Sequence, residues 1–196
     1  MNNIELINSL PDKKEYKNTT SHKFKKDLIS FFENKEIINA LEIGANHGHT
    51  TKVLSHLANK VYAIDWLTEN IEYIKEVNKD RDNVEIIQGD AYVDSTYENI
   101  NCKFDLVFID CVHIYENVIA DINRALQYFD EERGIYLVFD DYGHSHPVTR
   151  GVKKAIDESI QSGLKFETHI GEDKGYSFSN NSTLIGNEGI ILSYGI

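Results

Sequence analysis

Three observations predict that the chain folds as an α/β protein, with a doubly wound and mostly parallel sheet. Five short apolar segments alternate with amphipathic helical patterns, the order of a parallel sheet that helices cover on both faces. A glycine-containing loop follows the first apolar segment and leads into a helical pattern, as at a ligand-binding strand end. The length of 196 residues allows one good core and is too short for two ordinary domains.

The N-terminal residues are expected to form an arm, and residues 21–196 a single domain. Residues 1–20 are polar and include a charged cluster, so at most one short helix is expected there. Apolar side chains at helical spacing then predict an amphipathic helix over residues 21–34, with Ser21 as its N-terminal cap. Its solvated face is expected to carry Lys23, Lys25 and Lys26.

The regular alternation of strands and helices begins at residue 39. Strands are predicted at 40–43, 61–64, 84–87, 105–109 and 134–139. Helical patterns lie between them, at about 48–59, 67–79, 114–129 and 149–162, with a weaker one after residue 90. Two further strand-like segments, 165–170 and 189–194, are separated by turn-forming residues, which predicts an antiparallel hairpin at the end of the chain.

Charge and composition exclude several classes of partner. The formal net charge of −12 argues against nucleic acid or an anionic membrane surface as the main partner. No apolar segment approaches the length of a membrane span, and no signal peptide is recognisable. The two cysteines, Cys102 and Cys111, lack metal-site or redox-pair spacing, which favours a reducing compartment. A cytoplasmic protein is therefore expected, and its oligomeric state stays open, a homodimer included.

Acidic residues follow four of the five predicted parallel strands. Ligands of parallel α/β sheets bind beyond the carboxyl ends of the strands, so these positions are the candidates for a site. The positions that follow the five strands are Gly44–Gly48, Asp65-Trp66, Gly89-Asp90, Asp110–His113 and Asp140-Asp141.

The first three strand ends suggest a nucleoside site. Gly44 and Gly48 are four residues apart, so the G-x-G-x-x-G pattern of dinucleotide-binding proteins is absent. Asp65, about 20 residues beyond the loop, has the position of a carboxylate that binds ribose hydroxyls. Asp90 could accept from an adenine amine, with Trp66 or Ala91 as an apolar wall. Each of these residues could also be a structural turn or cap residue.

Taken in order, the motifs resemble those of class I S-adenosylmethionine-dependent methyltransferases. The matching segments are 41–48 (LEIGANHG), 63–65 (AID), 88–91 (QGDA) and 104–110 (FDLVFID). The resemblance implies a seven-stranded sheet with an antiparallel C-terminal strand, and S-adenosylmethionine as the cofactor. The cofactor-binding residues that it implies are Glu42, Gly44, Ala45, Asn46, His47, Gly48, Asp65, Trp66, Asp90, Ala91 and Asp110.

Two later segments resemble a narrower subgroup, the small-molecule O-methyltransferases related to macrocin and catechol O-methyltransferases. These segments are 108–116 (FIDCVHIYE) and 138–143 (VFDDYG). The resemblance implies a divalent cation held by Asp110, Asp140 and Asp141, although Cys111-Val112 stands where many relatives have glycine and aspartate. Neighbouring strand ends are about 4.8 Å apart, and crowded carboxylates favour a shared cation. Oxygen ligands favour Mg²⁺ or Mn²⁺.

A cation at this position could bind an acceptor hydroxyl and lower its pKa. His113 stands three residues past Asp110, where catechol-type relatives carry a lysine base, so it could deprotonate the acceptor. It could equally be a loop histidine that packs on Tyr115. His144 and His146 could be ligands, bases or substrate contacts, but exposure in a loop is favoured for both.

Three functions follow, in order of preference. The first is metal-assisted O-methylation of a small hydroxylated molecule by a cytoplasmic enzyme, with Asp110 and His113 as catalytic residues. The second is a metal-independent N- or O-methyltransferase with His113 as base. The third is a non-catalytic module that keeps the fold and binds a partner or an adenine nucleoside. The acceptor's identity stays open.

Overall fold

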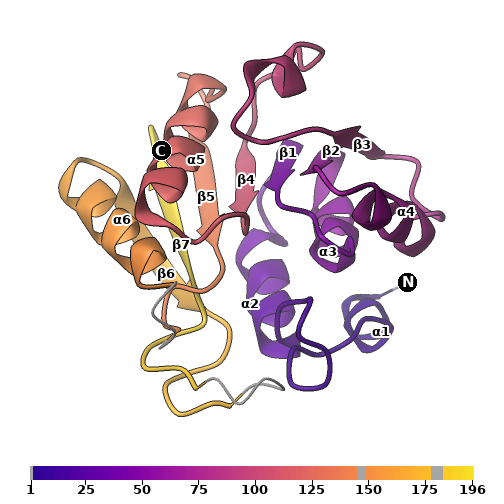
Figure 1. Ribbon diagram of the computed structural model, residues 1–196, viewed down its shortest axis with the longest axis horizontal. Coiled ribbons are helices and arrows are strands. Elements are labelled where there is room, and N and C mark those ends of the chain that lie inside the picture. The colour runs from indigo at the N-terminus through magenta and orange to yellow at the C-terminus, as the bar shows by residue number, and fades with distance from the viewer. Residues whose placement is uncertain (1, 145–148, 178–182) are drawn as a thin grey trace.

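The computed structural model describes residues 2–144, 149–177 and 183–196. They form one seven-stranded sheet with the strand order β3-β2-β1-β4-β5-β7-β6 (Figure 1). Strands β1 to β5 run parallel, whereas β7 is antiparallel to both β5 and β6. The strands are β1 (Ile37–Ile43), β2 (Ala58–Asp65), β3 (Val84–Gln88), β4 (Leu106–Ile109), β5 (Ile135–Phe139), β6 (Lys165–Ile170) and β7 (Gly189–Tyr194). The predicted fold and the terminal hairpin are confirmed.

Helices cover both faces of the sheet. They are α1 (Asn3–Asn8), α2 (His22–Phe32), α3 (His49–Leu57), α4 (Thr68–Val77), the 3₁₀ helix η1 (Asp94–Tyr97), α5 (Tyr115–Gln127) and α6 (Arg150–Gln161). The first three helices share one core cluster with one face of the sheet, whereas α5 and α6 pack on the other face. Among the described residues, none of the helices combines the length and apolar character needed to cross a bilayer.

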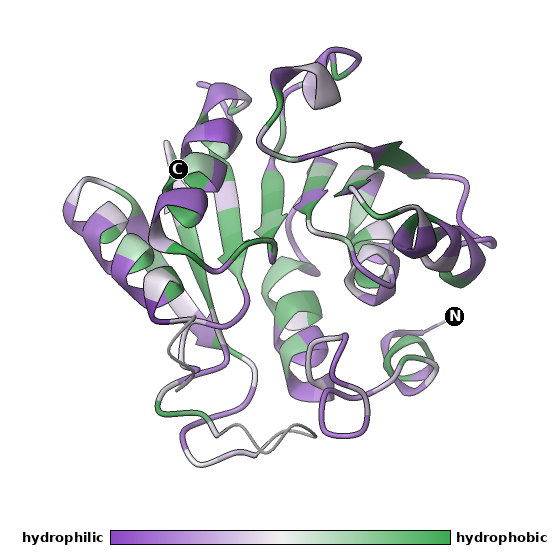
Figure 2. Ribbon diagram, in the orientation of Figure 1, coloured by the Kyte–Doolittle hydropathy of each residue, from purple (hydrophilic) through white to green (hydrophobic). Residues whose placement is uncertain are grey.

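The central strands are apolar because neither of their faces meets water. All four residues of β4 are buried, and Figure 2 shows the green of apolar residues along the strands and on the inward sides of the helices. Phe24 of α2 packs edge to face on Phe108 of β4, with 5.9 Å between the ring centroids. Burial of one such ring stabilises the fold by about 1.5–3 kcal/mol.

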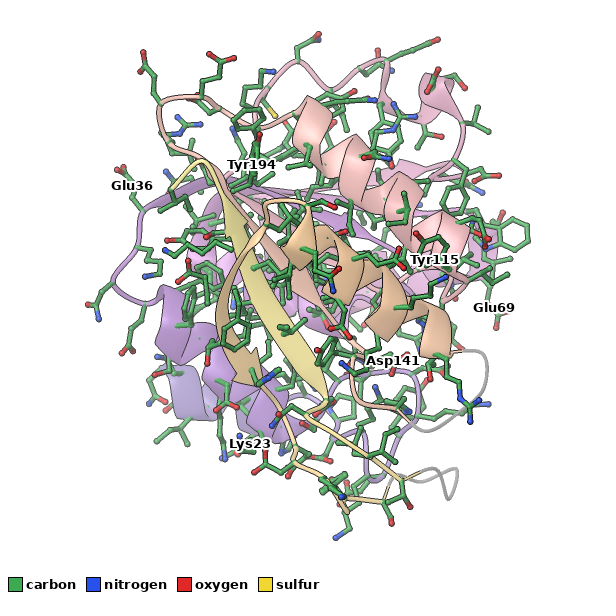
Figure 3. The ribbon with its side chains drawn as sticks, turned by 90° about the vertical axis from the view of Figure 1, so that its left-hand side faces the viewer. Lys23, Glu36, Glu69, Tyr115, Asp141 and Tyr194 are labelled. Carbon is green, nitrogen blue, oxygen red and sulfur yellow. The ribbon has the colours of Figure 1, made fainter. Side chains whose placement is uncertain are left out.

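The strand order creates a crevice at the carboxyl ends of the central strands. β1 lies between β2 and β4, so the crossovers that follow β1 and β3 leave in opposite directions along the sheet. A ligand crevice forms at such a switch point, beyond the carboxyl ends of the strands. Figure 3 shows Asp141, which follows β5, near one end of the sheet and Tyr194, at the end of antiparallel β7, near the other.

The N-terminal residues pack against the domain. Leu6, Ile7 and Leu10 are buried in the same core cluster as α2. The loop formed by residues 9–20, here called the strap, then leads to α2. Lys25 was expected on the solvated face of α2, and this prediction is wrong. Its side chain is buried, and its ammonium donates to the carbonyl oxygens of Pro11 and Thr20, partners that helical spacing does not reveal.

Candidate active site

The glycine loop after β1 has a backbone that requires glycine. Gly44 has a φ of +89°, and a Cβ there would lie 2.2 Å from the carbonyl oxygen of Asp110. Gly48, with a φ of +76°, is the N-cap of α3 and gives the helix no side-chain cap. The first N–H groups of α3 are thus left for a ligand anion such as a carboxylate.

A cavity of about 710 Å³ lies beside this loop and β2. Of the residues predicted to bind the cofactor, those that line it are Gly44, Asn46, His47, Asp65, Trp66, Asp90, Ala91 and Asp110. Trp66 is two-thirds exposed, with a relative accessibility of 68%, so its ring is available to a ligand. This cavity, called here the nucleoside cavity, has the size of a small-ligand site.

Asp65 organises the loops around the nucleoside cavity. Its carboxylate accepts from the backbone N–H groups of Asn46 at 2.8 Å and Leu67 at 3.0 Å, and from Asn70 Nδ2 at 3.0 Å. A carboxylate offers about four acceptor positions, so these bonds leave room for a ligand hydroxyl. Asp90 similarly accepts from the N–H of Tyr92 at 2.9 Å. Asp65 and Asp90 thus each hold a loop through hydrogen bonds and also line the nucleoside cavity, so a structural role does not exclude ligand binding.

A second cavity, of about 330 Å³, adjoins the first and is called here the acceptor cavity. The predicted residues that line it are Glu42, Gly44, Ala45, Asn46, Asp110, His113, Asp140, Asp141 and His144. Its strap residues are Lys13, Lys17, Asn18 and Thr19. The two cavities share Asn18, Gly44, Asn46 and Asp110, so they meet at the carboxyl ends of β1 and β4.

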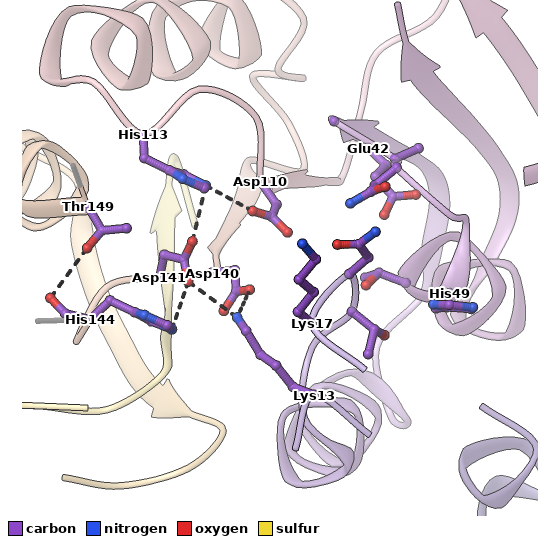
Figure 4. A pocket seen from close by; sticks show the side chains of 16 residues that line it. Lys13, Lys17, Glu42, His49, Asp110, His113, Asp140, Asp141, His144 and Thr149 are labelled. Carbon is purple, nitrogen blue, oxygen red and sulfur yellow. Dashed lines mark hydrogen bonds and ion pairs between the residues drawn. The ribbon is translucent and has the colours of Figure 1, made fainter. Parts of the chain in front are cut away.

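The acid cluster, defined as Asp110, Asp140 and Asp141, lies in the acceptor cavity (Figure 4). His113 bridges two of its members, with Nε2 at 3.2 Å from Asp110 Oδ1 and 3.2 Å from Asp141 Oδ2. Burial would lower the pKa of His113, but these carboxylates outweigh it and raise the pKa to about 9. In this arrangement His113 is therefore an imidazolium at neutral pH. One ligand atom each from Asp110, His113 and Asp141 lie within 4.8 Å of one another.

Lys13 of the strap enters the acid cluster from the opposite side. Its Nζ lies 2.7 Å from Asp140 Oδ2 and 3.3 Å from Asp141 Oδ1 (Figure 4). The same atom lies 3.9 Å from Glu188 Oε1. Burial opposes the charge on Lys13, but the surrounding carboxylates prevail and hold its pKa well above the ordinary value. Burial likewise disfavours a charged Asp141, yet Lys13 and the histidines keep the pKa of Asp141 low.

Several buried polar atoms of the acceptor cavity lack a hydrogen-bond partner among the described residues. They include Thr19 Oγ1, His49 Nδ1 and Asp140 Oδ1. A buried polar atom without a partner costs about 1–3 kcal/mol, which a polar ligand would recover. His49 is neutral, because burial lowers its pKa to about 4. Glu42 accepts from Thr51 Oγ1, and burial raises the pKa of Glu42 well above its ordinary value.

Some site residues were not foreseen. His144 was expected in an exposed loop, but it is buried and its Nε2 lies 3.0 Å from Asp141 Oδ1. His146 lies outside the described residues. No site role was predicted for Lys13 and Lys17 because they belong to a charged run before the first predicted strand. Only the tertiary fold brings that run to the carboxyl ends of β4 and β5.

Comparison with known proteins defines the class. A family model described as a methyltransferase domain matches residues 41–142, just over half of the chain. The chain therefore belongs to this methyltransferase family, and the predicted class of S-adenosylmethionine-dependent methyltransferases is confirmed. No match was found among curated proteins.

Solved structures, two O-methyltransferases among them, share the fold over nearly the whole chain. The O-methyltransferase TomG from Streptomyces achromogenes, in complex with SAM, is 17% identical, with 98% of this chain and 90% of that chain covered and a TM-score of 0.69. An O-methyltransferase from Bacillus cereus in complex with SAH is 20% identical, with coverages of 97% and 86% and a TM-score of 0.63. Cofactor-bound Rv0187 from MTB is also 20% identical, with the same coverages and a TM-score of 0.71.

Proposed function

We propose that this protein transfers the methyl group of S-adenosylmethionine to a hydroxyl oxygen of a small molecule. The observation that carries the proposal is the pair of adjoining cavities, one lined by Asp65, Trp66 and Asp90 and the other by the acid cluster. With the nucleoside in the first cavity, the methyl group would face the second at the shared residues Gly44 and Asp110. Alignment of donor and acceptor across this junction would supply much of the acceleration.

The donor would be held by its two polar ends. A ribose hydroxyl would donate to the acceptor position that Asp65 keeps free, with Asp90 near the adenine amine and Trp66 as an apolar wall. The carboxylate of the methionine part would lie at the N-terminus of α3, where Gly48 leaves the first N–H groups without a side-chain cap. These assignments follow the family resemblance and the lining of the nucleoside cavity.

The acid cluster fits a divalent cation, Mg²⁺ or Mn²⁺. Its donor atoms are carboxylate oxygens, and ligand atoms of Asp110 and Asp141 lie with one of His113 within 4.8 Å of one another. Asp140 Oδ1 has no hydrogen-bond partner among the described residues. Asp110, Asp140 and Asp141 would hold the ion. A bound ion would supply Lewis acidity that lowers the pKa of an acceptor hydroxyl. The side chains around it would position the acceptor.

A second candidate, metal-independent transfer, is favoured by one observation. The ammonium of Lys13 already neutralises part of the acid cluster, at 2.7 Å from Asp140 Oδ2. In this case His113 would accept the acceptor's proton and would first have to lose its own, because Asp110 and Asp141 hold it in the charged form.

The donor site is tested by Asp65→Asn. Loss of the carboxylate charge should weaken S-adenosylmethionine binding by about 10- to 100-fold, because hydrogen bonds to a charged group contribute about 1.5–3 kcal/mol. Isothermal titration calorimetry measures the affinity. Asp82→Asn, an exposed carboxylate before β3, is the matched control and should bind like the unmodified protein. Equal affinities of the two variants would refute the role of Asp65.

The metal role is tested by chelation during turnover. Release of S-adenosylhomocysteine would be followed with a panel of hydroxylated acceptors, with and without EDTA. Metal-assisted transfer predicts loss of activity in EDTA, recovery with added Mg²⁺, and no recovery in the Asp140→Asn/Asp141→Asn variant. Full activity of the unmodified protein in EDTA would instead establish the metal-independent candidate.

A further inference from the structure

The strap holds Lys13 in the acid cluster without being part of a helix or strand. The Lys25 ammonium donates to the carbonyl oxygens of Pro11 and Thr20, so the strap is pinned on both sides of Lys13. Asp12 adds a third attachment by accepting from the N–H of His22 at 2.9 Å. Between these points, Lys13 reaches Asp140 and Asp141 by its side chain, which can withdraw without unfolding a regular element.

Lys13 neutralises part of the negative charge of the acid cluster but does not contact all three carboxylates. It contacts Asp140 Oδ2 and Asp141 Oδ1, while the nearest partner of Asp110 is His113. Asp140 is only 4% exposed, and its Oδ1 has no hydrogen-bond partner in the part of the chain that the structure describes. An ammonium is thus an incomplete substitute for a cation that could bind oxygens of all three carboxylates.

We propose that Lys13 is the resident cation of the acid cluster and that a divalent ion binds there only by displacing it. The inference rests on the metal site proposed above. Mg²⁺ binds carboxylate oxygens at about 2.0–2.1 Å. The Lys13 ammonium, 2.7 Å from Asp140 Oδ2, would then lie next to the ion, and two cations so close repel each other strongly. Lys13 thereby sets the affinity of the site for metal.

The strap that carries Lys13 also contacts a residue of the nucleoside cavity, His47. Further along the strap, Tyr16 Oη lies 2.5 Å from His47 Nδ1, and Asn18 Nδ2 lies 3.5 Å from His47 Nε2. His47 belongs to the glycine loop and stacks on Tyr73, with 4.3 Å between the ring centroids. Both rings line the nucleoside cavity, so a shift of the strap that accompanied the release of Lys13 would also change that cavity.

The test is a Mn²⁺ titration of the full-length, metal-stripped protein, with free Mn²⁺ measured by electron paramagnetic resonance. Lys13→Met should bind Mn²⁺ at least about tenfold more tightly than the unmodified protein, because no internal cation competes. Lys14→Met removes an exposed charge from the next position and should leave the affinity unchanged. A residue with only a structural role would not give tighter binding when it is lost. Equal affinities of Lys13→Met and the unmodified protein would overturn the proposal.

Two further measurements separate the remaining outcomes. Lys13→Met leaves buried carboxylates unpaired, so its melting temperature should fall without metal and recover with Mn²⁺ more than that of the unmodified protein. An equal Mn²⁺-induced rise in both proteins would contradict displacement. Trp66, the single tryptophan, reports S-adenosylmethionine binding by fluorescence in the same samples. Donor binding without Mn²⁺ binding to either protein would reject both the metal role and the displacement, and would leave the methyl donor assignment intact.

Discussion

At the scale of single residues, the burial of the Asp121 carboxyl group makes the stability of the fold depend on pH. Asp121 of α5 is 2% exposed, and its carboxylate accepts a long hydrogen bond from Tyr92 Oη at 3.4 Å. Burial raises the pKa of Asp121 to about 7, against the weaker opposing effects of Tyr92 and His113. Because the folded protein binds this proton more tightly than the unfolded chain, the stability due to Asp121 is present at low pH. It is lost as the pH rises from about 4 through 7.

Asp121→Asn should therefore stabilise the protein at pH 8, on the order of 2 to 4 kcal/mol, and have little effect near pH 4. An asparagine keeps an acceptor for Tyr92 and carries no charge. Urea unfolding at both pH values measures the difference. Asp82→Asn, which removes an exposed charge, should shift the stability by less than about 0.5 kcal/mol at either pH. A destabilised Asp121→Asn at pH 8 would show that the charged form is the favoured one.

At the scale of elements, the turn after β1 is the most constrained segment of the site. Gly44 combines a positive φ with backbone atoms of Asp110 and Cys111 within 3 Å of where a Cβ would stand. The loop thereby joins the donor side of the site to the strand end that carries Asp110. A side chain at position 44 would push β1 and β4 apart at the junction of the two cavities.

Gly44→Ala should lower the free energy of unfolding by about 3–5 kcal/mol, with the clash adding to the cost of the left-handed backbone. Gly163→Ala is the matched control. It shares the positive φ, but an added Cβ would meet no described atom within 4 Å beyond its chain neighbours, so the change should cost only about 1–2 kcal/mol. Thermal unfolding compares the two variants. Similar losses in both would mean that backbone strain alone, without the clash, explains the glycine.

At the scale of the whole molecule, the sheet and the acids at its edge could be predicted from the sequence. Strands that are covered on both faces must be apolar, and the residues that end them stand directly after each apolar run, as Asp65 and Asp110 do. The strap could not be predicted, because a charged run looks the same whether it faces water or an acid cluster. The partners of Lys13 and Lys25 lie on other segments, and no local pattern records them.

Glu188 makes long-range contacts near the acid cluster that must form late in folding. It is fully buried and accepts from the N–H of Ser21 at 2.9 Å and from Ser21 Oγ at 2.5 Å, across 167 positions of the chain, and it also faces Lys13. During synthesis the strap emerges long before Glu188 exists, so these contacts form only after most of the chain has been made. Contacts between such distant positions form slowly because a long loop must close first. The contact between Glu188 and Lys13 therefore forms late in folding, and a chain truncated before Glu188 lacks it.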